Sequence, residues 1–249
     1  MMGLRERLRQ DAPFVTVFSI VPREEIVEMI GLAGFDAVLI DCEHGPFSVD
    51  SISGLVLAAR ARGIYSIVRV RENNPTMIGS ALDAGADGVL VPQVESRAEA
   101  ETVVAAARFA PAGSRGAHPW VRAAAFSGDP DWFRRTNEET AVLVMIEGKE
   151  GVAAAADIIA TPDLDGVFLG PVDLSHALGV PGNIDHPDVI ARVTEVVGMA
   201  KEQSKTAAVF TPTSEGAKRW LALGANMVAV GTDTAHFMDV LRQLRSEIS

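Results

Sequence analysis

Short apolar runs alternate with helical patterns eight times along this 249-residue chain, and few folds accommodate such a rhythm. Each run predicts a strand, and the apolar spacing and capping residues after it predict an amphipathic helix. The runs lack polar alternation, which is typical of parallel strands buried on both faces. We therefore expect a (β/α)8 TIM barrel, in one domain over residues 1–249. The predicted strands are residues 14–20, 37–43, 66–71, 88–94, 141–147, 166–170, 206–211 and 227–231.

A doubly wound open sheet would show a similar alternation. Its usual dinucleotide fingerprint, G-x-G-x-x-G after the first strand, is absent from this sequence, which favours the barrel. Residues 111–140 interrupt the rhythm and contain the aromatic residues Trp120, Phe126, Trp132 and Phe133. A segment of this length without a predicted element is typical of a lid or binding loop, unless it contains an element that the pattern misses.

Charge and composition narrow the class of protein. The formal net charge of −11 argues against nucleic acid and anionic membranes as partners, because both attract basic patches. The N-terminus mixes charges and does not look like a signal peptide, and no apolar run approaches the roughly 20 residues of a membrane span. The single cysteine, Cys42, excludes an internal disulfide and suits a reducing compartment, where we expect a packed side chain rather than a nucleophile. The sequence therefore predicts a cytoplasmic protein.

Polar side chains gather where the predicted strands end. The carboxyl ends of barrel strands meet at one face, which is where enzymes with this fold carry their active sites. We therefore expect one site from the following residues: Asp41, Glu43, His44, Arg69, Gln93, Glu147 and Asp173.

Glu147 and Asp173 are the candidate metal ligands. Two carboxylates from neighbouring strand ends, without a cluster of cysteine or histidine, favour a hard divalent cation such as Mg2+ or Mn2+ over zinc. The adjoining Gly170–Pro171 would let a ligand approach the main chain. The alternative is that each acid only caps the helix that follows it.

His44 is the candidate general base, and Asp41, three residues earlier, is placed to orient its ring. The alternative is a histidine hydrogen-bonded structurally at a turn. Arg69 interrupts an apolar strand, where a buried cation is costly unless it is paired. It is therefore bound to Glu43 or Glu147, or it awaits an anionic substrate, whose oxygens a guanidinium fork would match.

The residues that several common reaction types require are missing from this sequence. None of the four lysines lies within a predicted strand, which disfavours a Schiff-base mechanism. The chain has no P-loop and no G-x-S-x-G motif, so phosphoryl transfer and serine hydrolysis are disfavoured as well.

Six stretches, in order along nearly the whole chain, resemble the metal-dependent pyruvate aldolases of the HpcH/HpaI family, such as 4-hydroxy-2-oxoheptanedioate and 2-dehydro-3-deoxyglucarate aldolases. They are residues 34–44, 82–86, 111–116, 146–147, 165–175 and 228–234. The resemblance implies a barrel of the phosphoenolpyruvate/pyruvate superfamily and a class II aldolase that uses Mg2+, Mn2+ or Co2+. The implied reaction cleaves or forms a 4-hydroxy-2-oxo acid, to or from pyruvate or hydroxypyruvate and an aldehyde, in the catabolism of aromatic compounds or sugar acids.

The resemblance also assigns roles to residues. It implies Glu147 and Asp173 as metal ligands, His44 as the base, Asp41 as its dyad acid, and Arg69 as the arginine that stabilises the enolate. Asp83 matches an acid that the family uses to tune the histidine. The implied substrate-binding positions are Arg69, Met145, Gly170, Pro171, Val172 and Asp173. The family is usually hexameric, a trimer of dimers, and exchanges its last helix between subunits, so Asp83 is expected to act across an interface.

Two departures from the family pattern bear on the substrate. Met145 stands where the family often has glutamine, and Arg69–Val70–Arg71 stands where it often has Arg-Pro. Two other functions stay open at this stage. One is an acyl-CoA lyase of the citrate lyase β type, for which Arg115 and Arg122 offer little positive charge. The other is a barrel that binds 2-oxo acids without turnover.

Overall fold

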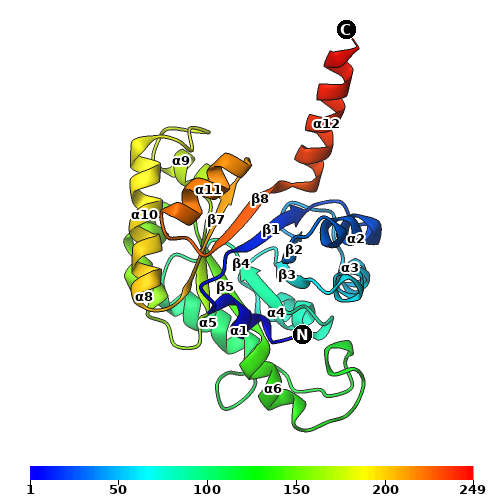
Figure 1. Cartoon of the computed structure of the whole chain (residues 1–249). Coiled ribbons are helices and arrows are strands. Elements are labelled where there is room, and N and C mark those ends of the chain that lie inside the picture. Colours follow the sequence, from blue (N-terminus) through cyan, green and yellow to red (C-terminus); the bar gives the residue numbers. More distant parts are fainter. Residues whose placement is uncertain (249) are drawn as a thin grey trace.

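The predicted strands close into one parallel barrel, shown in Figure 1. The computed structural model describes residues 1–248, except the side chains of Val49 and Asp50. Each strand pairs with the next, and the last pairs with the first, which completes the barrel. The predicted (β/α)8 fold is therefore confirmed. The strands are β1 Phe14–Ser19, β2 Ala37–Asp41, β3 Tyr65–Arg69, β4 Gly88–Val91, β5 Ala141–Ile146, β6 Gly166–Leu169, β7 Thr206–Thr211 and β8 Met227–Thr232.

Helices follow every strand and surround the barrel. Some predicted segments are divided: the single helix expected after β5 is two short helices, because the chain turns at Ala154. The helices are α1 Leu4–Leu8, α2 Glu24–Leu32, α3 Val49–Arg62, α4 Pro75–Asp83, α5 Arg97–Ala107, α6 Trp132–Glu139, α7 Lys149–Ala153, α8 Ala155–Ile159, α9 Pro171–Ala177, α10 Pro187–Glu202, α11 Ser214–Ala222 and α12 Asp233–Glu247.

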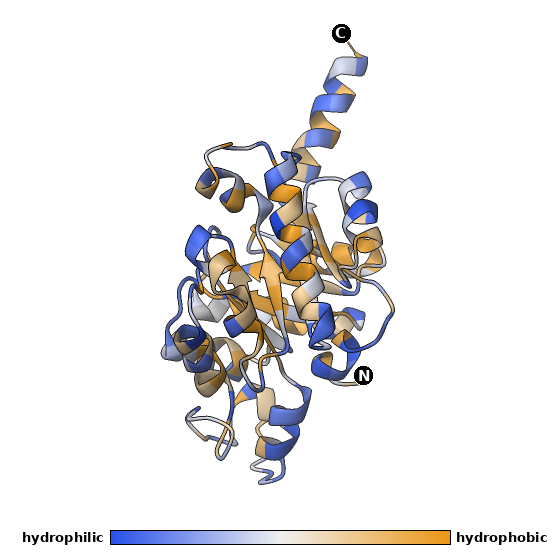
Figure 2. Ribbon diagram, turned by 90° about the vertical axis from the view of Figure 1, so that its left-hand side faces the viewer, coloured by the Kyte–Doolittle hydropathy of each residue, from blue (hydrophilic) through white to orange (hydrophobic). Residues whose placement is uncertain are grey.

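The strands are buried on both faces, as their unbroken apolar sequence predicts. In β2, Ala37 and Leu39 belong to the cluster inside the barrel, whereas Val38 and Ile40 belong to the cluster between barrel and helices. Figure 2 shows the hydrophobic strands between more hydrophilic helices. This alternation, with a period of two residues, decides which side chains at a strand end point inward.

The same alternation places the polar residues at the carboxyl end of the barrel. Asp41 continues the inward series of β2, and Arg69 continues that of β3, where it is paired in register with Asp41. Met145 is an inward residue of β5, so Glu147, two positions later, also emerges on the inner side. The strand pattern therefore delivers charged groups to one opening of the barrel.

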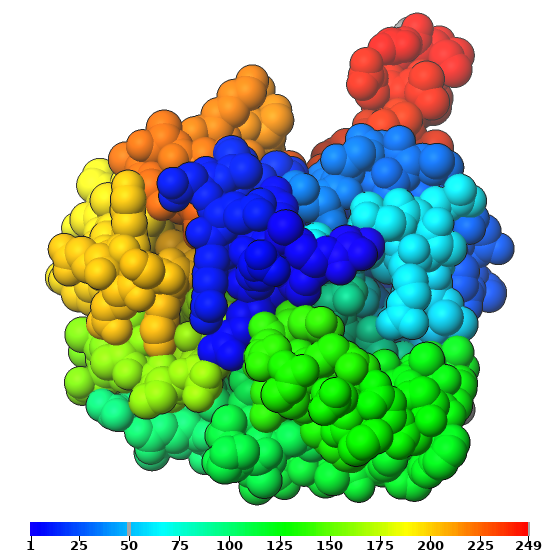
Figure 3. All heavy atoms as spheres, turned by 60° about the horizontal axis from the view of Figure 1, so that its bottom comes forward, coloured from blue at the N-terminus to red at the C-terminus, as the bar shows by residue number. Residues whose placement is uncertain are grey.

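The N-terminal segment closes the opposite opening. Leu4 and Leu8 of α1 are buried within the cluster inside the barrel. In Figure 3 this segment lies at the centre of the amino-terminal face, with residues 111–140 beside it. The charged N-terminus was not predicted to be a structural plug.

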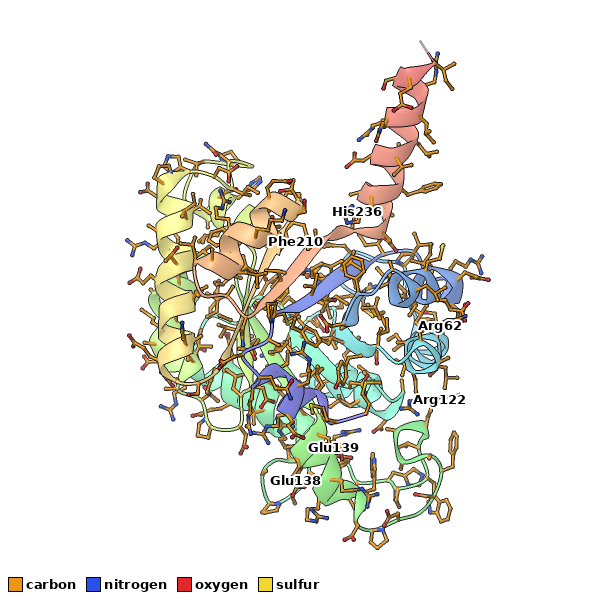
Figure 4. The ribbon with its side chains drawn as sticks, viewed as in Figure 1. Arg62, Arg122, Glu138, Glu139, Phe210 and His236 are labelled. Carbon is orange, nitrogen blue, oxygen red and sulfur yellow. The ribbon has the colours of Figure 1, made fainter. Side chains whose placement is uncertain are left out.

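Residues 111–140 do not form a lid over the polar opening of their own chain. They contain a 3-10 turn, Arg122–Ala124, and the helix α6, and they connect α5 to β5 at the amino-terminal end. Figure 4 shows Arg122, Glu138 and Glu139 at the end of the molecule away from Phe210 and His236. The predicted lid is therefore wrong for the chain's own site, because a connection that enters a strand lies at the amino-terminal face.

The last helix, α12, projects away from the barrel in Figure 1. None of its described residues is buried, and Phe237, Val240 and Leu244 are more than half exposed. Among residues 1–248, no helix combines the length and the apolar character that crossing a lipid bilayer requires.

Candidate active site at the carboxyl end of the barrel

A cavity of about 330 Å3 opens where the carboxyl ends of the strands meet. Residues after β2, β4 and β5 and the first turn of α9 line it: Glu43, His44, Gln93, Glu95, Glu147, Gly148 and Asp173. A larger cavity, of about 450 Å3, lies at the amino-terminal end beside Lys201 and Lys205. It contains none of the strand-end residues predicted to carry chemistry, so the smaller cavity is the candidate site.

Glu147 and Asp173 approach one point from two elements. A Cβ atom added to Gly170 would lie 3.3 Å from Glu147 Oε2 and 3.4 Å from Asp173 Oδ2. The absence of a side chain at Gly170 therefore leaves space for both carboxylates. The alternative that these acids only cap helices is not supported, because the cap residues are Gly148 and Gly170, without side-chain capping bonds, and Glu147 accepts from the Gln93 N–H instead.

Burial raises the pKa of Glu147 to about 7, and the nearby carboxylates of Asp173 and Glu43 add to this effect. The Gln93 N–H and the Arg69 guanidinium act in the opposite direction. A raised pKa means that the ionised form of the carboxyl group is disfavoured, and a bound cation would stabilise that form. The surroundings of Glu147 therefore favour binding of positive charge.

The donor set fits a hard divalent cation that keeps most of its coordination sites for water and substrate. Within the described part of the chain, no group of three or more His, Cys, Asp or Glu side chains is arranged to hold a metal ion. Two carboxylate ligands are sufficient for Mg2+-like ions, which retain several waters, whereas structural zinc needs four protein ligands.

Arg69 is held by two carboxylates. Its Nε and Nη2 atoms donate to Asp41 Oδ1 and Oδ2 at 2.9 and 2.6 Å, and its Nη1 lies 3.0 Å from Glu43 Oε2. The guanidinium also lies over the Phe18 ring, with Cζ 4.7 Å from the centroid. A guanidinium has five N–H groups, so this arrangement leaves donors for a further oxygen. Of the partners considered from the sequence, Glu43 is confirmed, and Asp41 was not anticipated.

Asp41 contacts the main chain of His44 rather than its ring. The carboxylate is 1% exposed, and Oδ1 accepts from the Glu43 and His44 N–H groups at 3.1 and 3.3 Å. Both of its oxygens also bind Arg69, which corrects the expectation that Asp41 orients the imidazole. His44 itself is exposed, lines the cavity, and has no ring hydrogen bond within residues 1–248. Its ring is therefore available to a ligand.

The expected substrate-binding positions form two groups. Met145 lies inside the barrel, with Sδ 3.8 Å from Arg69 Nη1. Gly170 is the N-cap of α9, and Pro171, Val172 and Asp173 form its first turn, but only Asp173 of this group lines the cavity.

Three lining residues were not given a role from the sequence: Gln93, Glu95 and Gly148. Gln93 was noted only for its place at a strand end. The sequence did contain a signal for two of them, because the polar residues Gln93 and Glu95 come soon after the buried strand β4.

Asp83 does not lie near His44 within one chain. It ends α4, at the amino-terminal side of the barrel, and binds Arg115 Nη2 at 2.6 Å. The Arg115 side chain is buried and lies over Phe109 and Trp132. Any effect of Asp83 on a histidine would therefore require another copy of the chain.

Cys42 packs as a buried side chain, as the sequence predicts. The side chain is buried, and this burial, together with the Asp41 charge, raises the pKa of the thiol to about 12. A thiol with a raised pKa is a poor nucleophile.

Comparisons of the sequence and of the fold with known proteins point to the same family. The family model described as HpcH/HpaI aldolase/citrate lyase matches residues 15–240. The 5-keto-4-deoxy-D-glucarate aldolase of Shigella dysenteriae is 38% identical over 217 residues, 87% of this chain and 85% of that protein. An HpcH/HpaI aldolase/citrate lyase family protein from Burkholderia cenocepacia has a TM-score of 0.93 and 31% identity, with 98% of both chains covered. An HpcH/HpaI aldolase from Desulfitobacterium hafniense has a TM-score of 0.92 and 27% identity, with 100% of this chain and 97% of that one covered.

Proposed function

The chain belongs to the HpcH/HpaI aldolase/citrate lyase family, and on this premise we propose that it is a divalent-metal-dependent aldolase acting on a 4-hydroxy-2-oxo acid. The observation that carries the proposal is the approach of Glu147 and Asp173 to one point beside Gly170, in a cavity shared with His44. The relatives that match most of this chain are aldolases, which makes the chain a carbon–carbon lyase of the aldehyde-lyase type.

Glu147 and Asp173 would hold the cation, for which Mg2+, Mn2+ and Co2+ are the proposed candidates. A cation bound there supplies Lewis-acid polarisation of the 2-oxo group. The two acids supply the opposite charge, and the partial burial of Glu147 strengthens its attraction to a cation. Its hydrogen bond from the Gln93 N–H fixes one of its oxygens.

Arg69 and His44 would act on the substrate. During cleavage the bond between C3 and C4 breaks, and negative charge develops on the oxygen at C2. The remaining N–H groups of Arg69 would donate to this oxygen, from a guanidinium that Asp41 and Glu43 already hold in place. The exposed His44 ring would accept the proton of the C4 hydroxyl, and the C4 carbon leaves as an aldehyde. A proton returned to C3 of the resulting enolate, from the protonated His44 ring or from water, completes the 2-oxo acid. Asp41 would contribute by holding the Arg69 side chain and the main chain of His44.

The proposed products are pyruvate, or hydroxypyruvate, and an aldehyde. The named relative acts on a keto-deoxy-glucarate, which supports a sugar acid as the substrate class. The lining residues of the cavity include no lysine or arginine that would hold the phosphates of CoA, so the acyl-CoA alternative gains no support. Met145, Gly170, Pro171 and Val172 remain proposed substrate contacts.

We also propose that the protein is a homo-oligomer, a hexamer built as a trimer of dimers, in which α12 packs on a neighbouring copy. Support comes from the exposed apolar residues of this helix, which would otherwise face water. In such an assembly Asp83 would reach a histidine of another copy. The proposed location is the cytoplasm, because a chain with a single cysteine suits a reducing compartment.

Chelation tests the proposed chemistry. EDTA treatment should abolish cleavage of 4-hydroxy-2-oxo acids, and Mn2+, Mg2+ or Co2+ should restore it. Treatment with borohydride and pyruvate should leave the protein mass unchanged, since no lysine forms a Schiff base. Activity that survives exhaustive chelation, together with a borohydride-trapped adduct, would contradict the proposal.

A further inference from the structure

Gln93 has an unusual main-chain conformation at the edge of the cavity. Its φ angle is +55°, in the left-handed region that side chains other than glycine rarely adopt. Five non-glycine residues within residues 1–248 have positive φ, and the other four lie in connections that enter a strand, at the amino-terminal end: Ala125, Phe126, Asp163 and Ser204. Gln93 alone among these five lies at the carboxyl end. Strained residues of this kind cluster at functional sites.

The conformation follows from the path of the chain after β4. Val91 still pairs with Val144, but Pro92 and Gln93 leave the regular ladder. Val94 then returns to β5 and donates its N–H to the Met145 carbonyl at 3.2 Å. The departure turns the Gln93 N–H away from the β5 main chain and toward the side chain of Glu147.

Two contacts of Gln93 connect the two halves of the site. Its N–H donates to Glu147 Oε1 at 2.8 Å, and its side-chain Nε2 donates to Glu43 Oε1 at 3.4 Å. The other oxygen of Glu43, Oε2, binds Arg69 Nη1 at 3.0 Å. A continuous series of contacts therefore runs from the candidate cation ligand Glu147 through Gln93 and Glu43 to Arg69.

We propose that Gln93 is a positioning residue: its left-handed main chain fixes the cation-binding carboxylate of Glu147, and its side-chain amide fixes Glu43 and thereby Arg69. This inference rests on the proposed metal-dependent function. The two contacts together set the position of Glu147 relative to Arg69. Partners that orient metal ligands typically contribute 10- to 100-fold to metal affinity.

Two substitutions separate the main-chain contact from the side-chain contact. Gln93→Val keeps the N–H but adds a β-branched side chain, which disfavours positive φ, so the N–H should turn away from Glu147. Gln93→Asn tolerates positive φ and keeps the N–H in place, but its amide is one methylene shorter and should lose Glu43. Ser204→Val is the matched control, since Ser204 has the same φ of +55° at the opposite end of the barrel.

The first readout is binding of Mn2+ to the metal-free full-length protein, measured by calorimetry without substrate. Gln93→Val should raise the Kd for Mn2+ by about tenfold or more. Gln93→Asn and Ser204→Val should stay within about twofold of wild type. Thermal unfolding of the same samples shows whether each variant is folded. The fall in Tm caused by Gln93→Val should match the fall caused by Ser204→Val.

The second readout is steady-state cleavage with saturating metal. Gln93→Asn should lower kcat by about tenfold, the value of one hydrogen bond to a charged group, with metal affinity unchanged. This variant keeps the proposal testable if the valine variant does not fold.

The outcomes are distinct. Wild-type Mn2+ affinity in folded Gln93→Val, or an equal loss in Ser204→Val, would overturn the main-chain role. Wild-type kcat in Gln93→Asn would overturn the side-chain role. If the wild-type protein itself binds no Mn2+, the proposed function fails and this inference fails with it.

Discussion

Replacing Asp41 with asparagine should destabilise the protein strongly, although the two side chains have nearly the same shape. Asp41 is 1% exposed, and the Arg69 side chain that it binds is 9% exposed. The asparagine amide would present N–H groups to the Arg69 Nη2 atom, which now donates to a carboxylate oxygen at 2.6 Å. A buried cation would thus lose its principal partner.

Removing one partner of a buried ion pair costs about 3–5 kcal/mol. Glu43 retains its contact with Arg69 at 3.0 Å, so we expect the lower end of this range, about 3 kcal/mol. For a chain of this size, 1 kcal/mol corresponds to roughly 2–4 °C, which gives a fall in Tm of roughly 6–12 °C.

Urea denaturation and thermal unfolding of the purified protein measure this effect. Glu101→Gln is the control, because it removes one carboxylate from an exposed pair with Arg97 and should cost less than about 1 kcal/mol. The double variant Asp41→Asn with Arg69→Met should recover part of the loss, because it also removes the buried cation at similar volume. A loss below about 1 kcal/mol in Asp41→Asn, or no recovery in the double variant, would refute the interpretation of Asp41 as the partner of Arg69.

Three further perturbations test other parts of the site and assembly. The raised pKa of Glu147 means that the folded metal-free protein binds an extra proton between pH 4.5 and about 7, so its stability should fall as the pH rises through this window, by at most about 3 kcal/mol. Urea denaturation should show this slope, and Glu147→Gln should remove it; a rise in stability over the window would contradict the account. Phe237→Asp with Leu244→Asp in α12 should reduce the assembly size in analytical ultracentrifugation, whereas a monomeric wild-type protein would contradict the proposed oligomer. Asp83→Asn leaves buried Arg115 without its carboxylate, but the Asp83 side chain is 40% exposed, so the expected cost is about 1–2 kcal/mol of stability with Mn2+ affinity unchanged; a loss of affinity without a loss of stability would contradict this assignment.

The strands were predictable because their signal is local. Unbroken apolar runs such as residues 141–146 end in an acid, and this pattern indicates both a buried strand and the face at which the acid emerges. The location of Glu147 and Asp173 at the mouth of the barrel therefore followed from the sequence. The boundaries shifted by a few residues, since the chain at Pro92 and Gln93 leaves the sheet while its composition stays strand-like.

Other features depend on contacts between distant segments. The partner of Asp41 could not be read from its spacing to His44, because the pairing register of β2 with β3 places it opposite Arg69. The helix α6 was missed because its sequence is mostly polar and charged, with Trp132 as its one buried residue. The role of Gln93 lies in a main-chain angle, which the sequence does not indicate for a glutamine.

Hydrogen–deuterium exchange at C3 of pyruvate tests the central claim most directly, since it reports formation of the enolate without an aldehyde partner. In D2O with Mg2+, the wild-type protein should exchange the methyl protons of pyruvate, as followed by proton NMR. EDTA, or the substitution Glu147→Gln, should abolish the exchange. Exchange that persists after complete removal of metal, or its absence in the Mg2+-loaded wild-type protein, would contradict the account.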